Sequence, residues 1–125
     1  MLGKFLLTGA CLLTSCTLFA QGIMVNNNTS AYGTARKGVI CSGSIGDEGI
    51  IQPKTSKYIS EDIINSLCPD TCSIQVFMNR FCMGKAVATI KLDIKNRVGI
   101  TNVANVPGSG YVLDGSGFVL NINKT

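Results

Sequence analysis

The sequence predicts a small all-β protein: an antiparallel β-sandwich, immunoglobulin-like or related, with one short helix, after an N-terminal signal peptide. Three observations predict this fold class. Apolar and polar residues alternate with a period of two along much of the chain. Turn-forming residues interrupt the alternation about every ten residues, as they do between the short strands of sandwiches and barrels. Four cysteines follow residues 1–20, and disulfide bonds are typical of small exported domains.

The clearest strand is predicted over residues 86–94. Its apolar positions alternate with Val87, Thr89, Lys91 and Asp93, so one face is suited to a core and the other ends in charges. A second alternating segment, residues 73–79, precedes it, and the link contains Cys82 and Gly84. We therefore expect the two segments to form an antiparallel hairpin with a long loop.

Other elements have weaker patterns. Ser60 is a good N-cap, Glu61 and Asp62 suit the first turn of a helix, and Pro69 ends it, which predicts a helix of about two turns. The remaining predicted strands are 23–25, 31–35, 39–41, 54–59 and 98–104.

The C-terminal region contains a short internal repeat. Residues 108–114 read GSGYVLD and residues 115–121 read GSGFVLN. A seven-residue repeat is too short for a solenoid, and a duplicated strand that forms a hairpin explains it better. We expect strands at 111–113 and 118–122, joined by a turn over Asp114 to Gly117.

Residues 1–20 have the organisation of a signal peptide. Lys4 precedes an apolar run over residues 5–13, which is shorter than the roughly 20 residues that a membrane-spanning helix needs. Cleavage after Ala20 would leave a disulfide-bonded β-sandwich domain of residues 21–125. We therefore expect a secreted or periplasmic protein without a transmembrane segment.

A second processing site competes with the first. Residues 13–16 read Leu-Thr-Ser-Cys, similar to the lipobox in which a bacterial lipoprotein receives acyl chains on its cysteine. The alternative prediction is an outer-membrane lipoprotein anchored through Cys16, with a structural role in the envelope.

Either processing route leaves four cysteines for two disulfide bonds. A Cys72–Cys82 bond is disfavoured, because a strand over residues 73–79 spans about 23 Å between them. Two pairings stay open: Cys41–Cys72 with Cys68–Cys82, or Cys41–Cys82 with Cys68–Cys72. The spacings lack the paired C-x2-C units of a zinc site, so we expect no metal and no cofactor.

The composition excludes several chemistries. The chain has no histidine, so it has no Ser-His-Asp triad and no Cys-His dyad, and it contains no nucleotide-binding motif. Asp47 and Glu48 lie between glycines and predict a solvated turn, with a cation-binding or catalytic loop as the alternative. The adjacent bases Arg36 and Lys37 have no interleaved aromatic residues, and we expect no nucleic-acid partner.

Two loops are candidates for binding. One is residues 43–49, with Asp47 and Glu48, and the other is residues 80–85, with Arg80, Phe81 and Met83. Exposed loops on a rigid sandwich commonly meet partners. The favoured interpretation of Phe81 and Met83, however, is that both side chains fill the core beneath the loop.

These observations favour an exported, non-enzymatic binding protein whose partner is a protein or a glycan. The envelope lipoprotein is the first alternative. A small hydrolase that uses carboxylates is a further one. A peptidase inhibitor that uses residues 68–72 as a rigid loop is the last.

The chain resembles the uncharacterised small secreted all-β proteins of Gram-negative bacteria. The resemblance rests on the Asn-rich first strand, on Tyr32-Gly33-Thr34-Ala35, on the four cysteines and on Gly110-Tyr111. It covers most of the mature chain and implies secretion and a compact β fold. It implies no catalytic residues.

Overall fold

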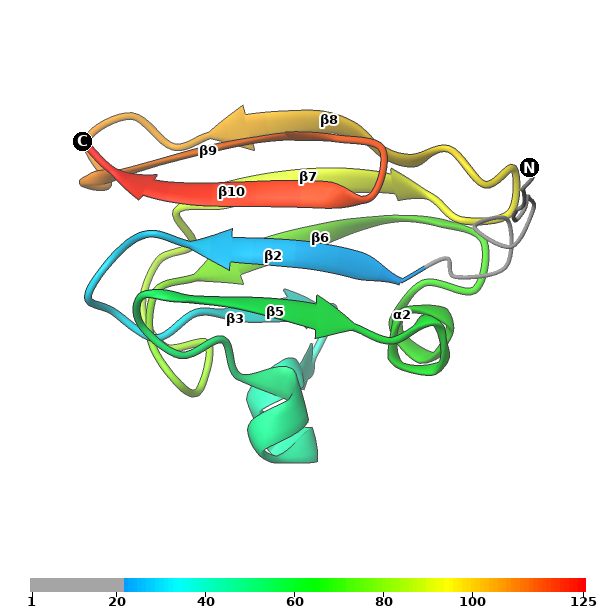
Figure 1. The fold of residues 1–125 in the computed structure, drawn as a ribbon, viewed down its shortest axis with the longest axis horizontal. Coiled ribbons are helices and arrows are strands. Elements are labelled where there is room, and N and C mark those ends of the chain that lie inside the picture. The colour runs from blue at the N-terminus through cyan, green and yellow to red at the C-terminus, as the bar shows by residue number, and fades with distance from the viewer. Residues whose placement is uncertain (1–21) are drawn as a thin grey trace, which may run out of the picture.

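The structure is a computed structural model that describes residues 22–125. These residues form two β-sheets packed face to face (Figure 1). The sheets have the strand orders β5-β2-β10-β9 and β4-β3-β6-β7-β8. The strands are β2 (Ile23–Asn27), β3 (Thr34–Lys37), β4 (Ile40–Cys41), β5 (Thr55–Ile59), β6 (Thr71–Phe77), β7 (Ala88–Asp93), β8 (Gly99–Asn105), β9 (Tyr111–Ser116) and β10 (Val119–Lys124).

The predicted all-β fold with one short helix is confirmed. The helix is α2 (Glu61–Leu67), and two 3-10 helices, η2 (Ser42–Ile45) and η3 (Asp47–Gly49), follow β4. No helix within residues 22–125 has the length and apolar character that crossing a bilayer requires. The predicted signal peptide and the alternative lipid site at Cys16 lie outside the described residues.

Strand β7 shows how the alternating sequence builds the core. Ala88, Ile90 and Leu92 are buried, whereas Lys91 is exposed. β6 pairs antiparallel with β7 and places Ile74 opposite Ile90, so the predicted hairpin is confirmed. The buried side chains of the two sheets meet in one apolar cluster that also includes Ile23, Val25, Val76, Ile100, Leu113, Leu120 and Ile122.

One strand pair departs from the antiparallel arrangement. β10 runs parallel to β2, with Leu120 opposite Val25, and the backbone N–H of Met24 donates to the carbonyl of Phe118 at 2.9 Å. The alternation in each strand indicates which face is buried but not the direction of its neighbour. The first and last strands of the sandwich are therefore direct neighbours, as Figure 1 shows.

The predicted turn over Asp114 to Gly117 is wrong in position. β9 continues to Ser116, and Asp114 lies opposite Asn121 and accepts a hydrogen bond from its side-chain amide at 3.0 Å. The chain reverses at Gly117 and Phe118, where Gly117 has a φ of 60°. Continued pairing with β10 moved the turn to the last glycine of the segment, which adopts that φ without steric cost.

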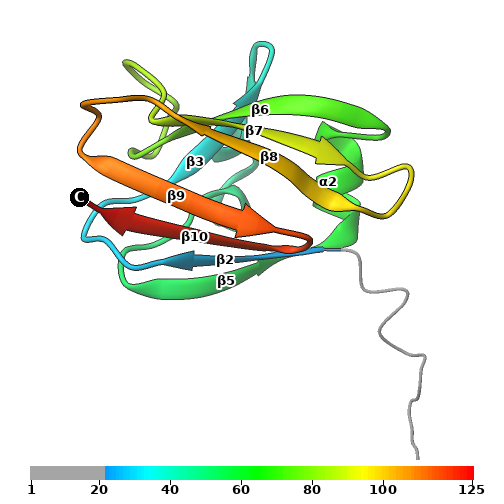
Figure 2. The same ribbon diagram turned by 90° about the horizontal axis from the view of Figure 1, so that it is seen from above.

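Helix α2 closes one end of the sandwich. The backbone N–H of Ile63 donates to Ser60 Oγ at 3.5 Å, which confirms the predicted N-cap. Ile64 is buried in the apolar cluster. Figure 2 shows α2 between the ends of the two sheets.

The two disulfide bonds are Cys41–Cys82 and Cys68–Cys72, with Cα separations of 6.0 Å and 5.7 Å. This pairing is one of the two that the sequence leaves open. Cys41–Cys82 joins the edge strand β4 to the β6–β7 loop, and its 41-residue separation corresponds to about 4 kcal/mol of loop-closure entropy. Cys68–Cys72 closes the link between α2 and β6, which corresponds to about 2 kcal/mol.

A buried asparagine organises the connection between β2 and β3. Asn27 is 1% exposed, and its Nδ2 donates to the carbonyls of Ala31 at 2.8 Å and Gln52 at 3.1 Å. Its Oδ1 accepts hydrogen bonds from the backbone N–H and the hydroxyl of Thr29, at 3.1 Å and 2.7 Å. These bonds hold a loop, so β3 begins at Thr34 and not at Ala31 as predicted.

Asn27→Ala is expected to lower the free energy of unfolding by about 3 kcal/mol, because it leaves buried donors and acceptors without partners. Chemical denaturation of the oxidised protein measures this. The matched control is Asn28→Ala, which removes an exposed side chain that donates to Asn123 and should change stability by less than about 0.5 kcal/mol. Equal effects of the two substitutions would contradict the role given to Asn27.

Candidate functional site

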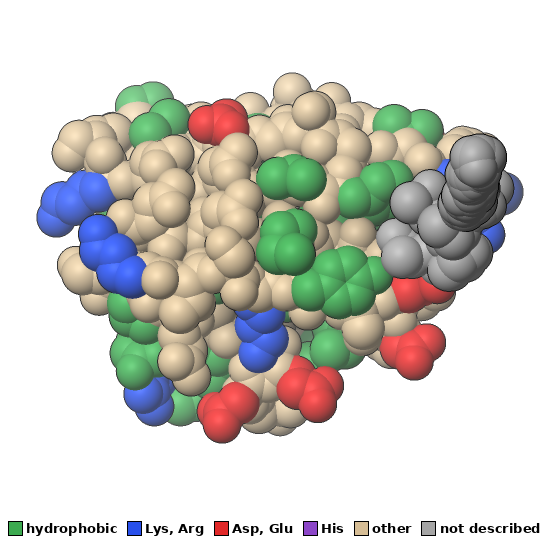
Figure 3. Space-filling view, viewed as in Figure 1, with side chains coloured by type: hydrophobic (Ala, Val, Ile, Leu, Met, Phe, Trp, Pro, Cys, Tyr) green, Lys and Arg blue, Asp and Glu red, His purple; other side chains and the backbone are tan. Residues whose placement is uncertain are grey.

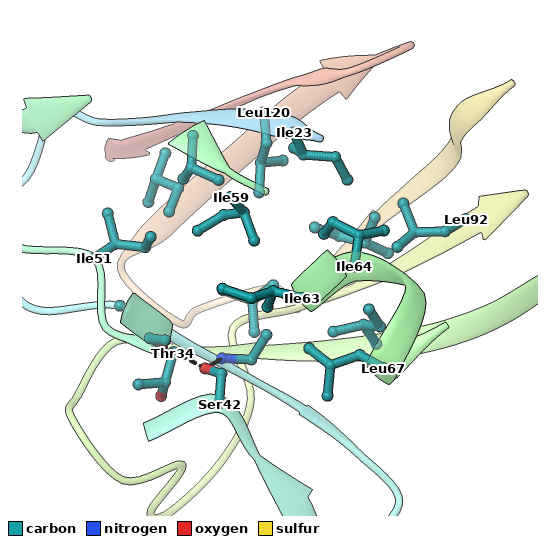
Figure 4. A pocket seen from close by; sticks show the side chains of 18 of the residues that line it. Ile23, Thr34, Ser42, Ile51, Ile59, Ile63, Ile64, Leu67, Leu92 and Leu120 are labelled. Atoms are coloured by element: carbon teal, nitrogen blue, oxygen red, sulfur yellow. Dashed lines mark hydrogen bonds between the residues drawn. The ribbon is translucent and has the colours of Figure 1, made fainter. Parts of the chain in front are cut away.

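A cavity of about 100 Å³ lies between the sheets beside α2 (Figure 4). Its wall is almost wholly aliphatic and includes side chains from both sheets and from α2. Those labelled in Figure 4 include Ile23, Ile51, Ile59, Ile63, Leu92 and Leu120.

The two hydroxyl groups in the wall of this cavity already have partners. Thr34 Oγ1 donates to the Asn79 carbonyl at 2.8 Å. Ser42 Oγ donates to the Gly49 carbonyl at 2.6 Å and accepts from the Ala35 N–H at 2.9 Å. Ligand pockets typically have volumes of about 300–1,000 Å³ and several convergent polar groups. The cavity is therefore better explained by incomplete core packing than by recognition of a ligand.

The loop between β6 and β7 is held by hydrogen bonds within it. Asn79 Oδ1 accepts from the N–H groups of Phe81 at 3.1 Å and Met83 at 2.9 Å, and Asn79 Nδ2 donates to the Met83 carbonyl at 2.8 Å. The N–H of Cys82 donates to Thr34 Oγ1 at 3.3 Å, and the Cys82 side chain is buried. With Cys82 directed inward, the neighbouring side chains of Phe81 and Met83 face solvent.

The interpretation of Phe81 and Met83 as core residues is wrong, since their exposed fractions are 61% and 67%. The aromatic residue buried in this region is Phe77, which is 0% exposed. The guanidinium carbon of Arg36 lies 4.7 Å from the centre of the Phe77 ring. Phe77 and Cys82 therefore supply the buried apolar contacts here, and the two predicted core residues remain at the surface.

The β3–β4 hairpin carries two further exposed apolar side chains. Val39 is 97% exposed and Ile40 is 53% exposed. The Cys41–Cys82 bond joins this hairpin to the β6–β7 loop. Val39 is two residues from Cys41, Phe81 is one residue from Cys82, and the Cα atoms of the two cysteines are 6.0 Å apart. Because consecutive Cα atoms are about 3.8 Å apart, the Cα atoms of Val39 and Phe81 are separated by roughly 17 Å at most. We call these four side chains, Val39, Ile40, Phe81 and Met83, the apolar tip.

Both segments of the apolar tip project on the same side of the molecule. Figure 2 shows the β3–β4 hairpin and the β6–β7 loop extending beyond the second sheet, away from the first. Four cations accompany them, and no aspartate or glutamate occurs in residues 32–40 or 79–87. One of the cations, Arg80, lies 4.2 Å from the centre of the Tyr32 ring. The four are Arg36, Lys37, Arg80 and Lys85.

Sequence reasoning named Arg80, Phe81 and Met83 as candidates but missed Val39 and Ile40. A signal was present, because the two branched apolar residues directly follow Gly38, which has a φ of 60° and forms the turn of the hairpin. Their proximity to the second loop depends on the disulfide pairing, which spacing alone did not decide.

The other candidate loop forms η2 and η3. Asp47 and Glu48 are exposed on η3, and Glu48 reaches the rim of the cavity. A Cβ on Gly43 would collide with the carbonyl of Arg80, so the start of this loop packs against the β6–β7 loop. Its acids lie at the other end, where Lys57 Nζ donates to the carbonyl of Asp47 at 2.7 Å.

The outer face of the first sheet carries a row of polar side chains (Figure 3). Ser56 donates to Asn26 at 2.7 Å, Asn26 to Asn121 at 2.8 Å, and Asn121 to Asp114 at 3.0 Å, which forms one row across four strands. Figure 3 shows hydrophobic side chains gathered toward one end of this face and polar ones over most of it. Because the side chains in the row bond to one another, stabilisation of the sheet accounts for it.

One carboxyl group has a shifted pKa. The pKa of Asp93 is below its usual value because the side chain and the backbone N–H of Asn96 donate hydrogen bonds to it, each at 3.0 Å. Asp93 lies at the end of β7 remote from the apolar tip, where these bonds stabilise the turn to β8. Within residues 22–125, no group of three or more His, Cys, Asp or Glu side chains is placed to hold a metal ion.

The fold and the surface define a disulfide-bonded β-sandwich with an exposed apolar tip. No protein-family model and no curated protein matches the chain. Among solved structures, it is similar to the Legionella pneumophila type II secretion system substrate NttC, with a TM-score of 0.67 and 16% sequence identity. The similarity covers 84% of this chain and 98% of the NttC chain, and it shows a shared fold.

Val76→Ile adds a methylene group to the wall of the cavity. We expect it to raise the free energy of unfolding by about 0.5–1 kcal/mol, because it buries apolar surface without displacing neighbours. The matched control is Ile90→Val, which should lower stability by about 0.5–1.5 kcal/mol. A loss of stability in Val76→Ile would indicate overpacking and contradict the cavity.

Phe81→Ala is expected to change the free energy of unfolding by less than about 0.5 kcal/mol, because the ring is mostly in solvent. Phe77→Ala should lower it by about 3–5 kcal/mol, because that ring is buried. Thermal and chemical unfolding of the two variants measures the difference. A large loss for Phe81→Ala would restore its interpretation as a core residue.

Proposed function

We propose that this is an exported, non-enzymatic binding protein that meets its partner through the apolar tip. The observation that carries the proposal is the exposure of Phe81 and Met83 on a loop fixed by the Cys41–Cys82 bond. Large apolar side chains on a constrained, protruding loop are typical of contact surfaces, because exposure brings the fold no packing gain.

Several observations support export. Both disulfide bonds suit an oxidising compartment. Residues 1–20 have the pattern of a signal peptide. NttC, which shares the fold, is described as a type II secretion system substrate. The proposed location is outside the cytoplasm, in the periplasm or the medium.

Binding is favoured over catalysis by the residues themselves. All four cysteines of residues 22–125 are in disulfide bonds, and the chain has no histidine. Asp47 and Glu48 are exposed on η3 rather than enclosed in a cleft. These features favour a contact surface over a carboxylate hydrolase.

Intact-mass measurement of the protein from its native host tests export. The expected product begins at Gln21 and lacks four hydrogens relative to the reduced chain. A product that begins at Cys16 and carries acyl chains would replace soluble release with a lipid anchor, which the lipobox-like residues 13–16 allow. A product that retains residues 1–20, or four free thiols, would contradict the proposal.

Site-specific cross-linking tests the contact surface. A photoreactive phenylalanine analogue at position 81 is expected to form adducts with surface components of intact cells. The same analogue at Val112, an apolar residue exposed on β9, is the matched control and should form none. Equal labelling from both positions, or none from position 81, would overturn the assignment of the apolar tip as the contact surface.

A further inference from the structure

We infer that the partner of the apolar tip is an anionic lipid membrane, into whose interface Val39, Ile40, Phe81 and Met83 insert. This inference rests on the proposed function and names the class of surface that the tip contacts. It follows from the shape, the internal hydrogen bonds and the charges of the two segments.

The shape of the apolar tip suits shallow insertion into a membrane interface. Its side chains stand on two projecting segments, and Figure 2 shows both extending beyond the second sheet. Val39, beside the turn glycine Gly38, is 97% exposed. An interface between proteins typically uses about 20–30 residues on each side, far more than these two loops present. A few apolar side chains suffice for shallow insertion, because each transfers to the acyl boundary without needing a shaped partner.

Three backbone N–H groups of the β6–β7 loop have hydrogen-bond partners within the protein. The side-chain carbonyl and amide of Asn79 form hydrogen bonds with the backbone of Phe81 and Met83. Cys82 donates its N–H to Thr34. The hydrocarbon boundary offers few hydrogen bonds, so a loop that bonds internally enters it at lower free-energy cost. The Cys41–Cys82 bond also orders both segments in advance, which reduces the entropy lost on binding.

The charges around the tip favour anionic lipid. Arg80 and Lys85 are exposed beside the β6–β7 loop, and Arg36 and Lys37 precede the turn of the hairpin. No acid lies in either segment to oppose them. Each Lys or Arg near an anionic surface adds to the attraction. Arg36 is held by Gln75 and the Phe77 ring, whereas the exposed Arg80 and Lys85 have long side chains that reach headgroups while the apolar residues lie deeper.

The test uses oxidised, non-acylated protein and vesicles of phosphatidylcholine with or without phosphatidylglycerol. Co-sedimentation should show binding to the anionic vesicles that weakens as salt rises. Phe81→Ser with Met83→Ser should weaken it by about tenfold or more. Arg80→Gln with Lys85→Gln should weaken it and flatten the salt dependence. Val112→Ser with Val119→Ser, on the opposite sheet, is the matched control and should bind as the parent does.

A fluorescent reporter separates insertion from adsorption. The chain has no tryptophan, so Phe81→Trp adds a single indole. Its emission should shift to the blue with anionic vesicles, whereas that of Val112→Trp should not. Near-ultraviolet circular dichroism and melting temperatures show that the variants are folded.

Three outcomes would overturn the lipid inference. They are no binding to anionic vesicles, equal binding by the Phe81→Ser Met83→Ser variant, and no spectral shift in Phe81→Trp. A protein adduct from position 81 without vesicle binding would overturn the lipid inference, leave the apolar tip as the contact surface and make its partner a protein. No adduct and no vesicle binding would remove both proposals.

Discussion

The sandwich depends on the parallel pairing of its first and last strands. β2 and β10 lie at the centre of the first sheet, and β5 and β9 attach to their outer edges. Without this pair, Val25 and Leu120 would have no common surface to place against the second sheet. The loop that the pairing closes is nearly the whole of residues 22–125. Because closure entropy rises only slowly with length, burial of the apolar faces outweighs it.

The Cys41–Cys82 bond has a local role that the core does not perform. β4 has two residues, Ile40 and Cys41, and pairs only with β3, so few hydrogen bonds hold it. The β6–β7 loop is long and lies outside the sheet. A covalent link between them holds two weakly paired segments together, so that both present their apolar side chains on the same side of the molecule.

The interior, the outer face of the first sheet and the apolar tip differ in polarity and charge. The interior is mainly apolar and contains a small cavity in whose wall the Thr34 and Ser42 hydroxyls have partners. The outer face of the first sheet has a row of polar side chains bonded to one another, with hydrophobic side chains toward one end. The tip differs from both, because its apolar side chains are more exposed, at 53–97%, and its nearby charges have one sign. Contact with a surface that is both apolar and anionic lowers the free energy of a surface of that composition.

The sequence alone determined what depends on neighbouring residues. It predicted the alternation in β7, the Ser60 cap of α2 and the all-β class, because periodicity and capping act within a few residues. Tertiary structure decided the direction of β10, the choice between two disulfide pairings and the exposure of Phe81. Each of these depends on segments far apart in the chain: β10 pairs with β2 across almost the whole described sequence, and the Cys41–Cys82 bond, which spacing could not assign, links the loop that exposes Phe81 to the β3–β4 hairpin.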